Sequence, residues 1–479
     1  MKHFGIIVSI VLLSVQALLA QQRPNVVIFI ADDVSWNDFG CYGNQEVKTP
    51  NIDRIAREGL RFTNVYLTAS SCSPSRNSIL SGRYPHNTGA AELHTPLPAE
   101  VPTFPGALKE AGYHCVSAGK WHSGPHAVKD FSLLQSKGNG DGGEEQWVNV
   151  LRDRPREKPF FMWFAALDAH REWGENQYAG SNPPDAISPP PYLANTPATR
   201  RDLAQYYDEI TRFDTYIGEV EEELKRQGVL DNTLIIIMAD NGRPFPRNKT
   251  RLYDEGIRTP FIVKWKNGIK VQEPQVSESL ISVIDIAPTI LELAGLPALP
   301  GFQGKSFSKV LKEPGRSFRN YVFAEHNWHN YEAYERMVRT KDWLYIYNGR
   351  PQFASSSASD IHRSPAFQDL VKGYQTGELT KAQQDNFIQP RPVEELYNCA
   401  KDPYQLTNLA EQAAHQKERQ KLKQVLKNWI DQTGDTQPDH LTPADSDWFS
   451  GKKLDTPLVR GEMPGAGSGA VSTTNKGPF

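Results

Sequence analysis

Cys72 stands in a short stretch of hydroxyl, proline and cationic residues, SCSPSRNSILSGRYPH, that begins at Ser71. A structural cysteine needs an apolar environment or a disulfide partner. This cysteine is instead followed by Pro74 and Arg76, at what the pattern predicts is the start of a helix. A thiol among hydroxyls and a cation suits a reactive group better than a packing role.

Two polar pairs each follow an apolar run. Asp32 and Asp33 come after NVVIFI, and Asp240 and Asn241 come after TLIIIM. Their three carboxylates and one amide oxygen are hard ligands suited to Ca²⁺ or Mg²⁺. Either pair alone could be a solvated loop or a helix cap. Two pairs after strands of one sheet indicate a site, because ligands of open α/β sheets bind beyond the carboxyl ends of the strands.

Other polar side chains follow predicted strands or the second polar pair. GKWH contains Lys120 and His122, His170 follows the run FFMWFAAL, and Lys249 lies a few residues after DNG. Each is weak evidence by itself, because loop cations are usually solvated and a single histidine more often serves packing than catalysis.

Apolar runs and amphipathic segments alternate over the first three hundred residues. The predicted strands are Asn25–Ile30, His114–Ala118, Phe160–Leu167, Thr233–Met238 and Phe261–Trp265. The predicted helices are Asn51–Gly59, Pro102–Ala111, Thr196–Gln227 and Ser277–Leu293. Strands separated by helices indicate an α/β domain with a large central, mostly parallel sheet flanked by helices.

The pattern changes after about residue 315. Tyr321–Phe323 and Arg336–Tyr347 predict antiparallel strands, and Ala413–Gln432 predicts a helix, so we expect a smaller C-terminal α+β subdomain with an antiparallel sheet. The predicted division is 22–320 for the N-terminal catalytic domain, 321–440 for the C-terminal subdomain and 441–479 for an irregular tail that either wraps the surface or stays disordered.

Composition limits the classes of partner. The chain has 479 residues and a net charge of −3, so no global basic field indicates nucleic acid or anionic lipid.

Residues 1–20 combine Lys2, an apolar run and Ala20, which is typical of a signal peptide, with an uncleaved anchor as the alternative. No later apolar run reaches about 18 residues, so stable membrane insertion is not expected. We expect an exported protein, periplasmic or secreted.

The run from Cys72 to Arg83, CSPSRNSILSGR, resembles the sulfatase signature C-x-P-S-R-x-x-x-L-[ST]-G-R. Further segments in family order are RPNVVIFIADD, TPNIDRIAREG, GKWH, DNG, YDEGIRTP and ELYNCAKDPYQLTNL, so the resemblance covers roughly residues 24–435. DNGRPFP and SPAFQDL are similar to the heparan N-sulfatase (sulfamidase) branch. Ala169 stands where many sulfatases have a proline, and Lys249 stands at a basic position that is an arginine in the animal members of the sulfamidase branch. These departures leave the substrate open but not the type of reaction.

The resemblance implies the alkaline-phosphatase-like sulfatase fold and a set of site roles. Cys72 would be oxidised to formylglycine, an aldehyde that hydrates to a diol, by a formylglycine-generating maturation enzyme. One Ca²⁺ per chain would be bound by Asp32, Asp33, Asp240, Asn241 and an oxygen at residue 72. The implied catalytic roles are alkoxide stabilisation by Arg76, sulfate binding by Lys120 and Lys249, proton acceptance by His122 and proton donation to the leaving group by His170.

We therefore expect hydrolysis of a sulfated saccharide, favouring the N-sulfate of glucosamine in heparin or heparan sulfate fragments. The alternatives are an exo-acting O-sulfatase on another sulfated polysaccharide, a phosphodiesterase or phosphonate hydrolase of the same superfamily, and an exported glycan-binding protein with an inactive site. Phosphatases of that superfamily bind more metals, and the sequence indicates no second ligand set. Trp328, His329 and Tyr331 could stack on a sugar or pack under a loop.

Overall fold

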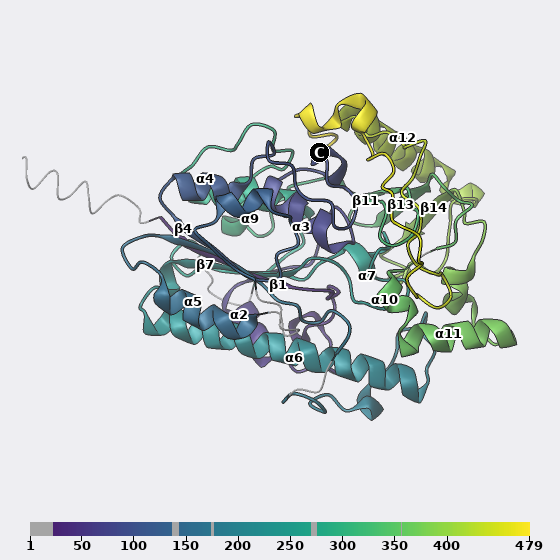
Figure 1. Cartoon of the computed structure of the whole chain (residues 1–479), viewed down its shortest axis with the longest axis horizontal. Helices are drawn as coiled ribbons and strands as arrows, with labels where there is room; N and C mark the ends of the chain where they lie inside the picture. The colour runs from purple at the N-terminus through teal and green to yellow at the C-terminus, as the bar shows by residue number, and fades with distance from the viewer. Residues whose placement is uncertain (1–22, 137–142, 174–176, 270–274, 356) are drawn as a thin grey trace, which may run out of the picture.

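A sheet of eight strands forms the centre of the molecule (Figure 1). This computed structural model describes residues 23–136, 143–173, 177–269, 275–355 and 357–479, so the predicted signal peptide lies outside the described residues. The strand order is β5-β4-β6-β1-β7-β8-β2-β9. The strands are β1 (Asn25–Ala31), β2 (Leu60–Phe62), β4 (His114–Gly119), β5 (Leu133–Gln135), β6 (Phe160–Ala165), β7 (Thr233–Ala239), β8 (Phe261–Lys264) and β9 (Gln275–Ser277).

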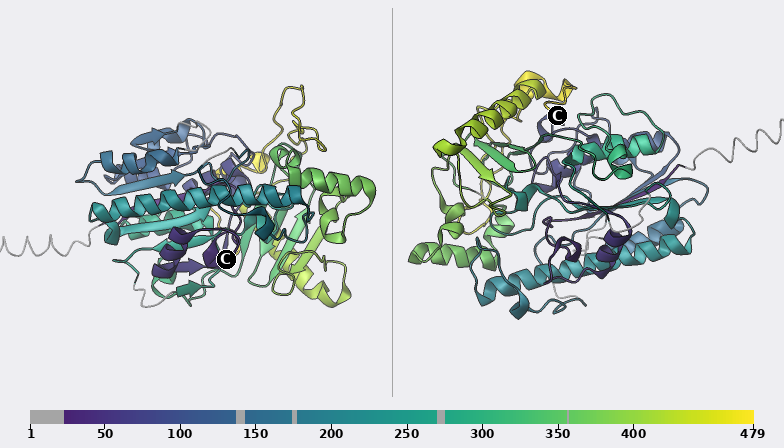
Figure 2. Two further views of the ribbon diagram at one scale, coloured as in Figure 1. Left: turned by 90° about the horizontal axis from the view of Figure 1, so that it is seen from below. Right: turned by 180° about the vertical axis from the view of Figure 1, so that it is seen from behind.

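Most neighbouring strands of this sheet are parallel, as predicted, and β8 alone among them runs antiparallel to both of its neighbours, β7 and β2. Helices cover both faces. On one side lie α2 (Pro50–Glu58), α5 (Trp147–Asp153) and α6 (Pro197–Arg226), and on the other lie α3 (Cys72–Ser81), α4 (Phe104–Glu110), α8 (Ile286–Leu293) and α9 (Ser308–Lys312). Figure 2 shows α6 running along the sheet.

The apolar runs form central strands because both of their faces are buried. Along β1, Val27 and Phe29 pack toward the α6 side, and Val26 and Ile28 pack toward the α3 side. Each such buried side chain stabilises the fold by about 1.5–3 kcal/mol. This two-sided burial explains why the sequence shows continuous apolar runs rather than alternation.

The predicted helix Ser277–Leu293 is too long at its start. Gln275–Ser277 is β9, Ile281–Ser282 is the short strand β10, and the α-helix begins only at Ile286. Ser282 and Asp285 form a capping box, in which the Ser282 N–H donates to Asp285 Oδ2 at 3.0 Å. The preceding residues pair with other strands, β9 with β2 and β10 with β3 (Val65–Tyr66), and this tertiary pairing outweighs their helical periodicity.

A second sheet of four antiparallel strands lies in the C-terminal part, as predicted. It consists of β11 (Val322–His326), β12 (Glu335–Arg339), β13 (Trp343–Asn348) and β14 (Glu394–Asn398). The predicted helix is α12 (Gln416–Thr433), whose Trp429 stacks on Phe323 with the ring centroids 5.1 Å apart. Two helices that were not predicted, α10 (Ser359–His362) and α11 (Pro365–Thr376), lie beside this sheet (Figure 1).

Residues 441–479 contain no α-helix and wrap the surface. The Arg83 guanidinium donates to the Val471 carbonyl at 2.6 Å, and the Asn87 amide donates to Ala470 at 2.8 Å. Of the two predicted alternatives for the tail, wrapping is therefore the one observed. The domain limits at residues 320 and 440 stay predictions.

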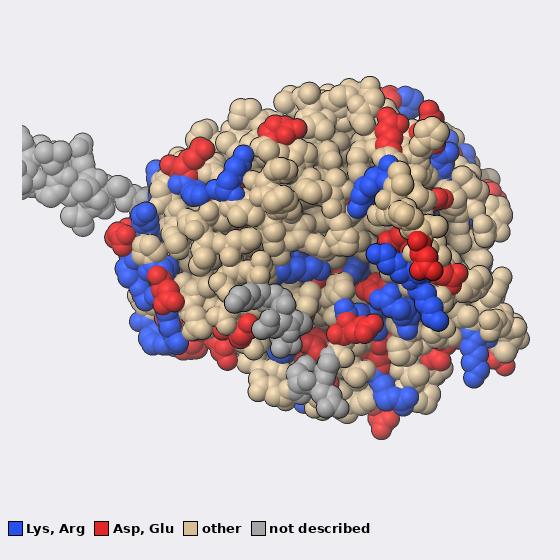
Figure 3. Space-filling model, in the orientation of Figure 1, with Lys and Arg blue, Asp and Glu red and all other residues tan. Residues whose placement is uncertain are grey.

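Acidic and basic side chains lie intermixed on the face drawn in Figure 3. Among the residues that the structure describes, no helix is both long enough and apolar enough to cross a membrane.

Candidate active site

The two polar pairs meet at one edge of the central sheet. β1 and β7 are neighbouring parallel strands with Ala31 opposite Ala239, so the residues after them emerge side by side. The Asp33 N–H donates to Asp240 Oδ1 at 3.2 Å, and the three aspartates are completely buried. Parallel pairing thus brings together carboxylates that lie more than two hundred residues apart in the chain.

Helix α3 brings Cys72 to these carboxylates. The helix begins at Cys72, as predicted, after an extended Ser71. Cys72 Sγ lies 3.7 Å from Asp32 Oδ1 and 3.9 Å from Asp33 Oδ1. Burial raises the pKa of the Cys72 thiol well above its usual value, despite the nearby lysines. The unmodified cysteine is therefore a neutral thiol here and not a thiolate nucleophile.

Each buried carboxylate has a cationic partner. Arg76 Nε and Nη2 each lie 2.8 Å from Asp240 Oδ2, and Lys249 Nζ lies 2.7 Å from Asp33 Oδ2. Lys120 Nζ contacts Asp32 Oδ2. Burial alone would raise the pKa of Asp32, but Lys120 and the other nearby cations outweigh it and hold that pKa well below the usual range.

The donor set fits a hard divalent cation. Burial raises the pKa of Asp33 and of Asp240 to about 6, against the opposing effects of Lys249 and Arg76. Asn241 Nδ2 donates to Asp33 Oδ1 at 2.5 Å, whereas Asn241 Oδ1 is buried and has no hydrogen-bond partner among the described residues. Crowded carboxylates and an amide oxygen without a donor are the ligand types that Ca²⁺ takes.

The two predicted histidines are neutral at physiological pH. Desolvation and Lys120 lower the pKa of His122 to about 2, and its ring lies 4.7 Å from that of His94. Desolvation and Lys249 lower the pKa of His170 to about 4. His170 Nδ1 contacts the backbone carbonyl of Arg171, and Nε2 lies 4.0 Å from Asp33 Oδ2. Nδ1 therefore carries the proton of the neutral ring, and Nε2 faces the carboxylates as an acceptor.

One set of contacts around Cys72 contains the predicted metal ligands together with Arg76, Lys120, Lys249 and His170. His122 lies near Lys120. Three further neighbours had no predicted role in this cluster, although His329 was considered for stacking on a sugar. The His94 ring lies tilted against the His122 ring, His329 Nδ1 lies 2.7 Å from Ser71 Oγ, and Asp360 Oδ2 lies 3.8 Å from Lys249 Nζ. The one sequence signal near Asp360 is the SPAFQDL run, which begins at Ser364.

Asp33, His170 and Asp360 form a second group whose ligand atoms all lie within 4.8 Å of one another. The Lys249 ammonium contacts both carboxylates of this group, so a side-chain cation already neutralises them.

The aromatic residues considered for sugar stacking pack under the tail instead. Trp328 and Tyr331 are only 3% and 5% exposed. Trp328 Nε1 donates to Pro443 O at 2.8 Å, and the Tyr331 hydroxyl donates to Asp447 O at 3.2 Å. Of the two predicted alternatives, packing under a loop is correct for these side chains, because residues after 440 cover them.

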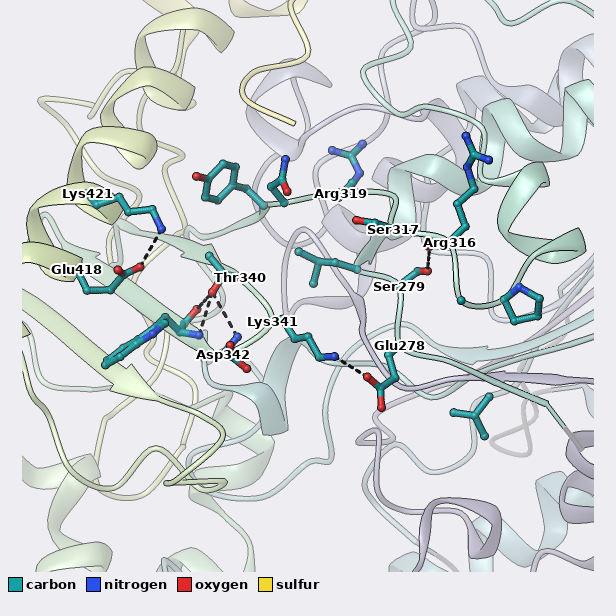
Figure 4. Close-up of a pocket in the computed structure, with 17 residues that line it drawn as sticks. Glu278, Ser279, Arg316, Ser317, Arg319, Thr340, Lys341, Asp342, Glu418 and Lys421 are labelled. Carbon is teal, nitrogen blue, oxygen red and sulfur yellow. Dashed lines mark hydrogen bonds and ion pairs between the residues drawn. The ribbon is translucent and has the colours of Figure 1, made fainter.

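A cavity of about 860 Å³ lies between Glu278 and the C-terminal sheet, and its lining does not include the predicted site residues (Figure 4). Four of its charged side chains form two ion pairs. Lys341 contacts Glu278 at 2.5 Å, and Lys421 contacts Glu418 at 3.3 Å.

Comparison with known proteins identifies the class of this enzyme. The family model described as Sulfatase matches residues 24–139 and 145–296. The chain belongs to the sulfatase family and is a sulfatase. The model described as N-sulphoglucosamine sulphohydrolase, C-terminal, matches residues 247–366. The resemblance seen in the sequence is thereby confirmed for the family.

Two sequence relatives and one solved structure illustrate the range of similar proteins. N-sulphoglucosamine sulphohydrolase of Homo sapiens is 30% identical over 87% of this chain and 92% of its own length. An ulvan-active sulfatase of Formosa agariphila is 28% identical over 86% of this chain and 76% of its own. A protein solved in complex with its substrate D-glucosamine-2-N,6-O-disulfate matches with a TM-score of 0.68 and 21% identity, covering 86% of this chain and 98% of that one. This structural likeness supports the fold.

Proposed function

We propose that this sulfatase hydrolyses the N-sulfate of glucosamine in heparin or heparan sulfate fragments, using formylglycine at residue 72 and one Ca²⁺. The observation that carries the proposal is the position of Cys72, whose Sγ lies within 4 Å of two buried carboxylates. Lys120 and Lys249 lie against the same two carboxylates. The preference for an N-sulfate is supported by the relationship to the human N-sulphoglucosamine sulphohydrolase and to the C-terminal model of that family.

Asp32, Asp33, Asp240 and Asn241 would hold the Ca²⁺, together with the oxygen of modified residue 72. When bound, the ion supplies positive charge that polarises sulfate oxygens and favours an ionised hydroxyl at residue 72. The hydrated aldehyde supplies the hydroxyl groups that an unmodified, protonated thiol lacks.

Four side chains would provide sulfate binding, charge neutralisation and proton acceptance. Lys120 and Lys249 place two ammonium groups against the carboxylates, where they can bind sulfate oxygens and neutralise the charge that develops during attack on sulfur. Arg76, one turn along α3 from Cys72, adds a third cation on the same side of the helix. Attack of one hydroxyl of the hydrated aldehyde on sulfur forms an S–O bond and breaks the bond from sulfur to the sugar. His122, which is neutral because of its low pKa, then accepts the proton of the second hydroxyl, while the C–O bond to the sulfate breaks and the aldehyde forms again.

His170 faces the leaving group in this proposal. An amine leaves an N-sulfate only after it has gained a proton, so an imidazole at this position must deliver one. Free of substrate, the ring is neutral because desolvation and Lys249 lower its pKa to about 4. The negative charge of a bound sulfamate would oppose this effect and favour the protonated ring.

The proposal is tested by incubating the enzyme with glucosamine N-sulfate, glucosamine 6-O-sulfate and a sulfated sugar from a polysaccharide other than heparin, and measuring free sulfate. We expect release from the N-sulfate, and mass spectrometry of the peptide that contains residue 72 should show the mass loss from cysteine to aldehyde. Cys72→Ala should fold, bind calcium and release no sulfate. A fully active preparation with only the unmodified thiol would refute the formylglycine scheme.

A second candidate is an exo-acting O-sulfatase on another sulfated polysaccharide. The ulvan-active sulfatase of Formosa agariphila, at 28% identity, favours this alternative. Release of sulfate from the non-heparin sugar, with none from the N-sulfate, would select it. In both cases we propose export, to the periplasm or beyond, and maturation by a formylglycine-generating enzyme.

A further inference from the structure

Asp360 is a largely buried carboxylate, with 13% of its side chain exposed, that reaches the catalytic cluster from the C-terminal part of the chain. Its Oδ2 lies 3.8 Å from Lys249 Nζ and 3.9 Å from His170 Nε2. These distances are too long for hydrogen bonds. Within the described part of the chain, Asp360 Oδ2 is buried and has no hydrogen-bond partner. The site therefore contains a charged acceptor with no protein donor.

A hydrogen bond and aromatic stacking fix the position of α10, the helix that carries Asp360. The Ser359 N–H donates to Asn330 Oδ1 at 3.1 Å. The His362 ring stacks on Phe367, with the ring centroids 4.2 Å apart, and on Tyr331 at 5.0 Å. Burial would raise the pKa of Asp360, but Lys249 and nearby histidines outweigh it and hold that pKa below the usual range. The carboxylate is thus charged and fixed before any substrate binds.

A buried acceptor without a donor is costly for a protein to retain, and a ligand that supplies the donor relieves the cost. His170 is the residue that faces the leaving group in the proposed function, and Asp360 lies directly beside its Nε2. With His170 in that role, a carboxylate at this point would face the atom that joins the sulfur to the sugar.

That bridging atom distinguishes two substrate classes. In a sulfamate it is a nitrogen that carries a hydrogen, whereas in a sulfate ester it is an oxygen that has only lone pairs. A carboxylate can accept a hydrogen bond from the first and repels the second. We propose that Asp360 is a specificity-determining residue that accepts a hydrogen bond from the bridging N–H and so selects sulfamates over sulfate esters.

This inference rests on the proposed function, because it needs His170 at the leaving-group end of the substrate. One hydrogen bond to a charged acceptor corresponds to about 10- to 100-fold in discrimination. Substitution of Asp360 should therefore lower kcat/KM on the sulfamate more than kcat/KM on the sulfate ester.

The test compares two sugars that differ only in the bridging atom, glucosamine 2-N-sulfate and glucose 2-O-sulfate. The mature, calcium-loaded full-length enzyme is assayed for kcat/KM on both, beside D360N and D360A. D360N keeps the shape of the side chain but offers an amide that can donate to an ester oxygen. We expect the N-to-O ratio of kcat/KM to fall about 10- to 100-fold in D360N, through a loss on the N-sulfate and no equal loss on the O-sulfate.

The matched control is D369N, because Asp369 lies on α11 and accepts a hydrogen bond from Thr199 Oγ1 at 3.1 Å, outside the cluster. The control should leave the ratio unchanged. Equal losses on both substrates in D360N and D360A would overturn the inference and assign Asp360 to charge balance at Lys249. A wild-type enzyme that releases sulfate only from the O-sulfate would contradict the proposed N-sulfate function itself. The two failures are therefore distinguishable.

Discussion

Calcium should stabilise this protein strongly at pH 7.5 and weakly at pH 5. The perturbation is removal of calcium with a chelator, and its effect follows from the carboxyl groups of Asp33 and Asp240. Burial raises the pKa of both to about 6 in the metal-free protein. The folded state therefore binds protons there more tightly than the unfolded chain does. The contribution of these two carboxyls to metal-free stability should be fully present below about pH 4 and should be lost as the pH rises through 6.

The magnitude follows from the same groups. A carboxyl pKa raised from 3.8 to about 6 corresponds to about 3 kcal/mol of destabilisation of the charged form. At pH 5 calcium must displace about one proton from each carboxyl, so its apparent affinity falls about tenfold for each, or about 100-fold in all. Calcium at 100 times its Kd at pH 7.5 stabilises by about 2.7 kcal/mol, and the same concentration at pH 5 stabilises by about 0.4 kcal/mol. Asp32 does not contribute in this range, because its pKa lies below the usual value.

The assay is urea unfolding at both pH values, with calcium and with chelator. N241A removes the buried amide oxygen and should weaken the calcium effect at pH 7.5. D231N is the matched control, since Asp231 is an exposed partner of Lys266 far from the site, and it should respond like the wild type. A calcium effect that is equal at both pH values, or larger at pH 5, would refute the reasoning.

Three further predictions concern catalysis and stability. H122A should lower kcat by about 10²–10⁴-fold, and a loss below tenfold would contradict the role of His122 as proton acceptor. The wild-type pH–rate profile should show no ionisation of the His122 imidazole between pH 5 and 8, because its pKa is about 2. R336M should destabilise the fold by about 3–5 kcal/mol in urea unfolding, because Asp435, whose Oδ1 lies 3.0 Å from Arg336 Nη2, would be left as an unpaired buried charge. Adding D435L should restore part of that loss, and an additive loss would argue against a shared ion pair. D214A should cost about 1–3 kcal/mol, because the Ile52 N–H at the start of α2 donates to Asp214 Oδ1 at 2.7 Å; an unchanged urea midpoint would show that water replaces this cap.

Elements with strong local signals were predictable. The runs that form β1 and β7 are apolar throughout because both faces of the central sheet are buried. Helix α6 begins after Thr196, whose hydroxyl accepts from the Thr199 N–H at 3.1 Å, and it buries one continuous apolar stripe. These signals depend on neighbouring residues, so they can be read without knowing the fold.

Elements that depend on distant partners were missed or wrongly bounded. Strands β3 and β10 have two residues each and form only because each pairs with the other across the chain. The helix expected from Ser277 starts later for the same reason. A two-residue strand has no periodicity, so its sequence carries no signal.

The sequence by itself determined the chemistry of this protein. The run that begins at Cys72 resembles the sulfatase signature and so indicated the family, and the polar pairs after two apolar strands predicted hard metal ligands at one edge of the sheet. The tertiary structure alone decided which distant residues complete the site. Asp360 lies beside Lys249, and His329 beside Ser71, only because long-range packing orients α10 and the loop after β11. The direction of a buried side chain depends on contacts from the whole fold, and no local pattern records them.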